Sequence, residues 1–210
     1  MANNFFNKTN MNVSADHNLP TYVYTVPTSK KTIVIELDVA NRSTSSQTIS
    51  VLIDDFTAKG SNIASTAATI SSNTIVSATH SFTTGDVVRL TKSGSTAIRV
   101  SGAEPATAGN NTDPVYYVIV ATASTFKLAS SHSNATAGTA LTVTGTTANA
   151  DIWNTLAFTY IVRDAPIPIG GALKVIAGQK LVMEATDSMI VQTSSANSVD
   201  SIASILEDVS

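Results

Sequence analysis

Apolar and polar residues alternate along several stretches of this chain with a period of two, the spacing that buries one face of a β-strand. The clearest stretch is 32–40. Its expected inner face carries Ile33, Ile35, Leu37 and Val39, and its outer face carries Val34, Glu36 and Asp38. The stretch 201–206 places Ile202, Ser204 and Leu206 on one face and Ala203 and Ile205 on the other. A short helix at 197–207 is the alternative there, and the Ser and Ile content favours a strand.

The segment 21–54 combines three apolar stretches, which are 21–26, 32–40 and 47–55. Residues with turn-forming composition separate them, first around Pro27 and then around Asn41-Arg-Ser-Thr-Ser. Short connections favour pairing between consecutive strands. We therefore expect a three-stranded antiparallel meander in this segment.

The character of the chain changes near residue 57, where a small, polar stretch reads as a linker. Short apolar runs then follow at 74–76, 86–90, 115–120, 125–128 and 140–143. Five short strands separated by turn-like clusters indicate a compact β-domain of its own.

The earlier character returns after residue 149, with expected strands at 156–162, 173–176, 180–184, 189–193 and 201–206. The blocks 19–57 and 149–210 are each small for an independent sandwich, and together they have the size of one. We therefore expect an all-β fold, an antiparallel β-sandwich of 19–57 plus 149–210 interrupted by a β-domain at 58–148. The hinge points would be Asp54-Asp-Phe and Asp151-Ile-Trp. Three consecutive pieces without an insertion are the simpler alternative.

Residues 1–18 are polar and rich in Asn, apart from Phe5 and Phe6. We interpret them as an N-terminal arm. One reading is a frayed terminus. The other is an arm that orders against a neighbouring subunit, with the two adjacent aromatic residues as its anchor.

Composition narrows the function classes. Charged residues make up 13% and hydrophobic residues 43% of the chain, which is not the composition of a disordered protein. The formal net charge is −3, and the longest basic run is Lys30-Lys31, so no nucleic-acid-binding face is indicated. The chain contains no cysteine, which excludes disulfides and thiolate chemistry. It shows neither a signal peptide nor a membrane-spanning stretch, so we expect no membrane partner.

The residues that could carry chemistry do not form a catalytic pattern. His17, His80 and His132 are far apart in sequence, and we interpret all three as surface histidines. The nucleophile motif Gly-x-Ser-x-Gly is absent. Gly170-Gly and Gly178-Gln-Lys do not have the spacing of a phosphate-binding loop. We expect no enzyme activity, no cofactor and no metal.

Two carboxylates, Glu184 and Asp187, flank a turn that could hold Ca²⁺ through carboxylate and carbonyl oxygens. The competing interpretation is a turn in which the aspartate bonds the local backbone. Aromatic residues make up only 6% of the chain, with one Trp, which argues against a sugar-cleaving groove.

Two sets of motifs resemble proteins of tailed bacteriophage particles. The first combines Tyr24-Thr-Val-Pro, the apolar strand ending at Asn41-Arg-Ser, Pro166-Ile-Pro-Ile-Gly, Lys180-Leu-Val-Met-Glu and a terminal Ser204-Ile-Leu-Glu. It is similar to small β-sandwich virion proteins of tailed phages, including marine phages and phages of cyanobacteria. It departs slightly from them, because Met183 stands where leucine is common.

The second set lies in the expected insert and comprises Thr79-His-Ser-Phe-Thr-Thr-Gly-Asp, Tyr116-Tyr-Val-Ile and Ser124-Thr-Phe-Lys-Leu-Ala. It resembles a small β-module that recurs in phage tail and fibre proteins. Together the two resemblances cover most of residues 21–207, and their motifs consist of strands and turns rather than catalytic residues.

The resemblance implies a non-enzymatic structural component of a virion, assembled in the host cytoplasm. It would be located at the neck, collar or tail side of the particle, or on the head surface as a decoration or cement protein. A fibre-base adaptor is the third possible role. Its partners would be capsid, portal, neck or tail proteins, and the chain would form a homo-oligomer. The alternative is a host-glycan-binding attachment module, with a site around Tyr116, Tyr117 and Trp153. A cell-wall or capsule hydrolase is the third and weakest reading.

Overall fold

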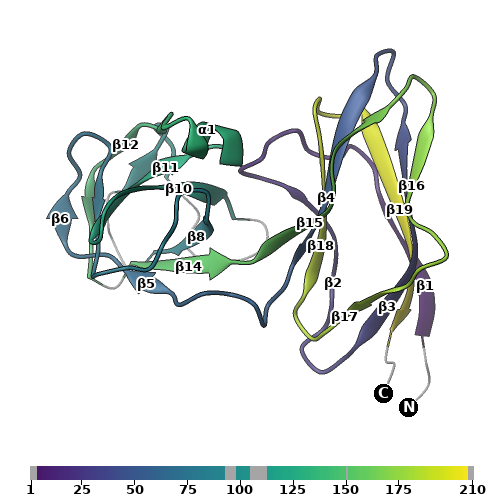
Figure 1. The fold of residues 1–210 in the computed structure, drawn as a ribbon, viewed down its shortest axis with the longest axis horizontal. Helices are drawn as coiled ribbons and strands as arrows, with labels where there is room; N and C mark the ends of the chain where they lie inside the picture. The colour runs from purple at the N-terminus through teal and green to yellow at the C-terminus, as the bar shows by residue number, and fades with distance from the viewer. Residues whose placement is uncertain (1–3, 93–97, 105–112, 150, 208–210) are drawn as a thin grey trace. The chain divides into compact units, whose positions relative to one another are not determined.

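The computed structural model describes residues 4–92, 98–104, 113–149 and 151–207, which form two compact units (Figure 1). The first unit comprises Met1–Ala58 and Ala157–Ser210, and the second comprises Lys59–Leu156. Nearly all regular structure is β, and the sheets are antiparallel throughout, which confirms the expected all-β fold class.

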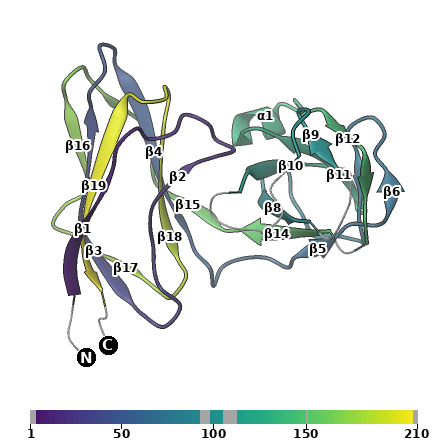
Figure 2. The ribbon, with the colours of Figure 1, turned by 180° about the vertical axis from the view of Figure 1, so that it is seen from behind.

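The first unit is a sandwich of two sheets (Figures 1 and 2). The β3 sheet has the order β1 (Asn4–Asn10), β19 (Val199–Glu207), β3 (Thr32–Asn41), β16 (Ala172–Ile176), with β17 (Leu181–Met183) also paired to β3. The β4 sheet has the order β15 (Phe158–Ile167), β4 (Gln47–Asp54), β18 (Ser188–Thr193), β2 (Thr21–Thr25). Side chains of both sheets share one core, which includes Val34, Leu37, Val51, Met189 and Ile205.

The expected meander is wrong. Strands β2 and β4 lie in one sheet with β18 between them, while β3 lies in the other sheet. Each of the four N-terminal strands pairs with strands that come after residue 157, and none of them pairs with another. Alternation between the sheets gives every strand a buried face, which an isolated three-stranded meander could not provide.

The face assignment within β3 is also wrong in its first half. Val34, Leu37 and Val39 are fully buried, whereas Ile33 and Ile35 are only half-buried. The pairing of β3 with β19 shifts between Glu36↔Ser204 and Val34↔Ile205, so Ile35 is the extra residue of a β-bulge. One inserted residue reverses which side chains face the core. In β19 the predicted faces are confirmed, because Ala203 and Ile205 are fully buried.

Residues 4–10 of the N-terminal arm form a strand of the sandwich. Strand β1 pairs with β19 along its whole length, from Asn4↔Glu207 to Asn10↔Ser201. Phe6 packs against the core, and Val13 is fully buried in it. Sequence could not show this, because the isolated segment has too few apolar residues to display a buried face.

The second unit contains a six-stranded sheet and two short ribbons. The sheet order is β5 (Ile63–Ala64), β14 (Ile152–Leu156), β8 (Val87–Thr91), β10 (Val115–Thr122), β11 (Thr125–Ala129), β7 (Ile75–Val76). The ribbons pair β9 (Arg99–Val100) with β12 (Val143–Thr144), and β6 (Ala68–Thr69) with β13 (Thr146–Thr147). Within the described part of this unit, one short helix, α1 (His132–Thr136), occupies a segment expected to be a turn, and Ser131 caps it.

The second boundary between the units lies later than expected, at Leu156 instead of residue 148. Strand β14 pairs with β5 and β8, so Trp153 belongs to the core of the second unit and is not a hinge residue. The sandwich resumes with Phe158, which pairs with Asp54. The two ends of the second unit therefore join the paired strands β4 and β15 of one hairpin.

Candidate functional site

The three histidines do not come together, and two of them are half-buried. His17 is exposed, and His132 is half-buried against Gly85, where an added Cβ would lie 2.9 Å from its Nε2. His80 packs between Phe82 and Phe126, with ring-centroid distances of 4.9 and 5.7 Å. Both of its ring nitrogens are buried without a hydrogen-bond partner among the described residues. His80 is therefore half-buried, with its ring nitrogens turned away from solvent.

The turn at Glu184 and Asp187 bonds the local backbone. Asp187 is buried, and its two carboxylate oxygens accept hydrogen bonds from the backbone N–H groups of Phe56, at 2.9 Å, and Glu184, at 2.8 Å. The Glu184 carboxylate pairs instead with Lys31 at 3.1 Å. Within the described ranges, no group of three His, Asp or Glu side chains is placed to hold a metal ion.

The aromatic residues of the glycan-binding alternative lie inside the second unit. Tyr116, Tyr117 and Trp153 are 5%, 2% and 0% exposed. The Trp153 indole N–H donates to the Ser65 hydroxyl at 2.9 Å, and its ring meets Phe126 edge to face. None of these rings offers a face to a sugar, so a site around them is wrong. Fully buried aromatic rings serve the core, a role that sequence alone does not separate from a surface platform.

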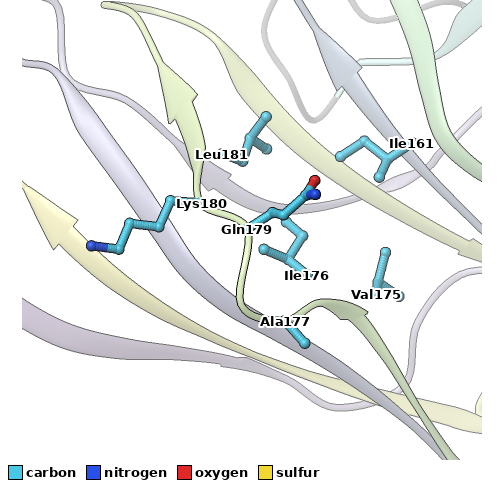
Figure 3. Close-up of a pocket in the computed structure, with 7 residues that line it drawn as sticks. All are labelled: Ile161, Val175, Ile176, Ala177, Gln179, Lys180 and Leu181. Atoms are coloured by element: carbon cyan, nitrogen blue, oxygen red, sulfur yellow. The ribbon is translucent and has the colours of Figure 1, made fainter.

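An apolar groove lies at one open side of the sandwich, between β15 and the β16–β17 edge (Figure 3). Its volume is about 320 Å³. Aliphatic side chains from both sheets line it, and Lys180 points away from them (Figure 3). The lining residues are Ile161, Val175, Ile176, Ala177, Gln179, Lys180 and Leu181. Its lining is mainly aliphatic, so it suits apolar groups.

A row of apolar side chains crosses the outer face of the β3 sheet. The row consists of Phe5, Leu206, Ile33 and Val182, which lie side by side on β1, β19, β3 and β17 because they are directly paired in register. Their neighbours along each strand, Phe6, Ile205, Val34 and Met183, face the core, so the row faces outward. Its end residues, Phe5 and Val182, are 62% and 60% exposed.

Two sets of charges beside this apolar row are paired within the chain. Lys31 and Glu184 form an ion pair next to the Val182 end of the row. On β3 and β16, Lys174 pairs with Glu36 and lies 3.9 Å from Asp38. A partner covering the row would therefore meet neutral, apolar surface between self-neutralised groups. Exposed rows of this kind mark interaction surfaces more often than isolated exposed residues do.

A buried polar network joins the two sheets on the core side of the sandwich, at the end where the apolar row lies. The Tyr24 hydroxyl donates to Glu207 Oε2 at 2.7 Å, and Lys30 Nζ donates to Glu207 Oε1 at 2.8 Å. The hydrogen bonds from Lys30 and Tyr24 lower the pKa of Glu207. Burial, together with the neighbouring Glu207, raises the pKa of Tyr24 to about 12. The network holds β2 of one sheet to β19 of the other.

The lowered pKa of Glu207 predicts a loss of sandwich stability in acid. Because the folded state holds this carboxylate below its ordinary pKa of 4.5, its contribution is complete above that value and disappears as pH falls through the folded pKa. We expect the free energy of unfolding of the first unit to drop more between pH 6 and pH 3 in the wild type than in Glu207→Gln.

Urea unfolding monitored by NMR of the sandwich at both pH values measures this difference. Glu184→Gln is the matched control, since its exposed ion pair contributes little and should leave the acid loss unchanged. Equal acid losses in the wild type and Glu207→Gln would contradict the assignment.

Comparison with family models, curated proteins and solved structures finds no match to this chain. In the part of the chain that the structure describes, no helix is long and apolar enough to cross a membrane. Function is therefore inferred from the surfaces of the two units and from the sequence motifs.

Proposed function

We propose that this chain is a non-enzymatic structural component of a tailed-phage virion that self-associates through the outer face of its β3 sheet. It is located at the neck, collar or tail side of the particle, or on the head surface as a decoration protein. Its partners are capsid, portal, neck or tail proteins. The observation that carries self-association is the row of Phe5, Leu206, Ile33 and Val182. The sequence motifs of the sandwich and the second unit support the virion assignment.

The roles of the buried acids support a non-enzymatic protein. Asp54 accepts a hydrogen bond from the backbone N–H of Ala157 at the junction of β4 and β15. Asp187 accepts from two backbone N–H groups, and Glu207 accepts from Tyr24 and Lys30. Each of these carboxylates is committed to holding strands or turns together, which leaves no free acid–base pair among them.

The chemistry of the row suits a second copy of the chain as its occupant. Four adjacent aliphatic and aromatic side chains gain free energy on burial in proportion to the apolar area removed from water, at about 25 cal/mol per Å². A two-fold axis would bring the same row of two copies together, since an isologous interface uses one patch twice. The ion pairs Lys31–Glu184 and Lys174–Glu36 beside the row leave none of these four charges unpaired at its edges.

A charge placed in the row should prevent this association. We expect Val182→Asp to convert an oligomer into a monomer, because a carboxylate would be buried at one end of the apolar contact. Val182 is 60% exposed, so the substitution should leave the fold intact. Light scattering coupled to size-exclusion chromatography measures the mass of each variant.

The matched control is Ile169→Asp, which changes an equally exposed residue, 65%, outside the row. It should remain oligomeric. A monomeric wild type would contradict self-association through this face. Gold-labelled antibody on the parent particle tests the virion assignment separately: label over the shell indicates a decoration protein, label at one vertex or along the tail indicates a neck or tail part, and unlabelled particles would overturn the assignment.

A further inference from the structure

Strand β1 forms an open margin of the β3 sheet (Figures 1 and 2). It pairs with β19 over seven residues, from Asn4↔Glu207 to Asn10↔Ser201, without a shift of register. On its other side it pairs with no strand among the described residues. A long, regular and open edge is a template for pairing with another strand.

The other edges of the sandwich are blunted. The pairing of β15 with β4 shifts twice, and β15 contains Pro166. The pairing of β16 with β3 also shifts, and β17 has only three residues. Strand β2 has five residues between Pro20 and Pro27, and its pairing with β18 shifts as well. Bulges, prolines and short strands protect sheet edges from pairing, so β1 is the edge that suits a partner strand.

The backbone groups that β1 offers to a partner follow from its pairing with β19. The Val13 N–H donates to the Val199 carbonyl oxygen at 3.0 Å, so Val199 directs its backbone groups toward the N-terminal segment. Because this direction alternates along a strand, every second residue from Val199 to Glu207 does the same. The residues of β1 that pair with the intervening positions direct their N–H and C=O groups away from the sheet. They are Phe5, Asn7 and Thr9.

We propose that the β1 strands of two copies of this chain pair antiparallel across a two-fold axis at Asn7, which joins their β3 sheets. With the axis there, Phe5 lies opposite Thr9 of the second copy, and Asn7 lies opposite Asn7. All the outward-directed residues of β1 are then used, and each such pair exchanges two backbone hydrogen bonds. A two-fold axis lets one edge serve as both halves of the contact.

Lys8 is the charged residue of β1, and it favours this register. A lysine on an edge strand usually opposes pairing. With the axis at Asn7, however, Lys8 lies opposite Phe6 of the second copy. Within one chain the Lys8 Nζ already lies over the Phe6 ring, 5.4 Å from its centroid, an attractive contact for a cation. An axis at Lys8 would instead set two lysines opposite each other, and an axis at Phe6 would place Thr9 beyond the paired strand.

The edge contact rests on the proposed self-association through the apolar row. A backbone hydrogen bond contributes little net free energy compared with the entropy that two chains lose on association, so a single edge contact does not hold two free copies together. A dimer formed through the row presents two β1 edges. Two edge contacts made together hold where one does not, because the second forms within an existing complex. We therefore expect four copies in the wild-type assembly.

Single cysteines on the outer face of β1 test the pairing and its register. The chain has no cysteine, so each variant carries one thiol. Asn7→Cys sets two thiols opposite each other at the axis, where the Cα atoms are about 5.5 Å apart, within the range of a disulfide. Thr9→Cys is the matched control, because Thr9 is exposed on the same strand but lies roughly 14 Å from Thr9 of the second copy. After oxidation with copper–phenanthroline, we expect a covalent dimer of Asn7→Cys and a monomer of Thr9→Cys on a non-reducing gel.

Asn7→Pro tests the backbone contact without a thiol. It removes the outward N–H at the axis, and proline is tolerated at an edge position whose N–H faces solvent, so β1 should stay paired with β19. Light scattering coupled to size-exclusion chromatography should show the mass of the assembly falling by half, to that of the dimer formed through the row. Asn7→Ala keeps the N–H and should keep the wild-type mass.

The outcomes separate this contact from the contact through the row. An oligomeric wild type together with an uncross-linked Asn7→Cys would overturn the edge pairing and leave the row contact standing. Equal cross-linking of Asn7→Cys and Thr9→Cys would overturn the axis at Asn7. A monomeric wild type without a cross-link would overturn both contacts. The cysteine variants keep the test decisive even where Asn7→Pro fails to fold.

Discussion

Replacement of Trp153 by alanine is expected to unfold the second unit while the sandwich stays folded. Trp153 is fully buried on β14, donates its indole N–H to Ser65, and meets Phe126 edge to face with ring centroids 5.4 Å apart. Removing a buried Trp side chain costs about 3–5 kcal/mol, a large part of the stability of a domain of this size. The two units have separate cores, so the loss should be confined to residues 59–156.

Amide NMR spectra of Trp153→Ala should therefore retain the dispersed signals of the sandwich and lose those of the second unit. The matched control is Ile152→Ala on the same strand, which changes a residue that is 37% exposed and should leave both units folded. Because Trp153 is the single tryptophan, its fluorescence in the wild type follows unfolding of the second unit alone. Loss of both units together in Trp153→Ala would show that they fold as one body.

Asn41→Asp is expected to destabilise the sandwich by about 3 kcal/mol or more, because it turns a buried amide into a buried charge. The Asn41 side-chain NH₂ donates to the carbonyl oxygens of Ser45 at 2.8 Å, Ile167 at 3.0 Å and Pro168 at 3.2 Å. Its oxygen accepts from the backbone N–H and the hydroxyl of Ser43. A carboxylate at this position would still accept the two hydrogen bonds from Ser43. Its other oxygen would face the carbonyl oxygens of Ser45, Ile167 and Pro168, which it cannot bond.

Chemical denaturation of the sandwich measures the effect of Asn41→Asp. Asn7→Asp makes the same chemical change at an exposed site, where the side-chain oxygen only accepts from Ser204, and it should cost little. A small loss of stability in Asn41→Asp would mean that the carboxylate turns out to solvent, and that the Asn41 bonds do not hold the β3–β4 turn to the end of β15.

Much of the strand content could be predicted from sequence, and the pairing of the strands could not. Period-two alternation located β19 and its two faces correctly, because no bulge interrupts the buried positions there. In β3 the bulge at Ile35 reversed the faces, and no local signal marks a single inserted residue. The choice between consecutive pairing and alternation of sheets depends on what covers each strand, which lies far away in sequence.

The same limit applies to the candidate sites. Phe5 was recognised as unusual in a polar segment, but the row it forms with Leu206, Ile33 and Val182 requires knowing that four distant strands are neighbours. The open edge of β1 likewise follows from the strand order, since no local signal shows which side of a strand is left unpaired. Conversely, the aromatic residues proposed for glycan binding were core residues, since composition cannot distinguish a buried ring from an exposed one.

The strand order has a consequence for how the chain is made. When β1 to β4 leave the ribosome, every strand with which they pair is still unsynthesised, and the whole of the second unit must be translated first. The second unit can close on itself during that interval, whereas the first 58 residues wait as unpaired edges. A chain stopped after β14 and before β15 would therefore release a folded second unit carrying an unfolded, association-prone leader.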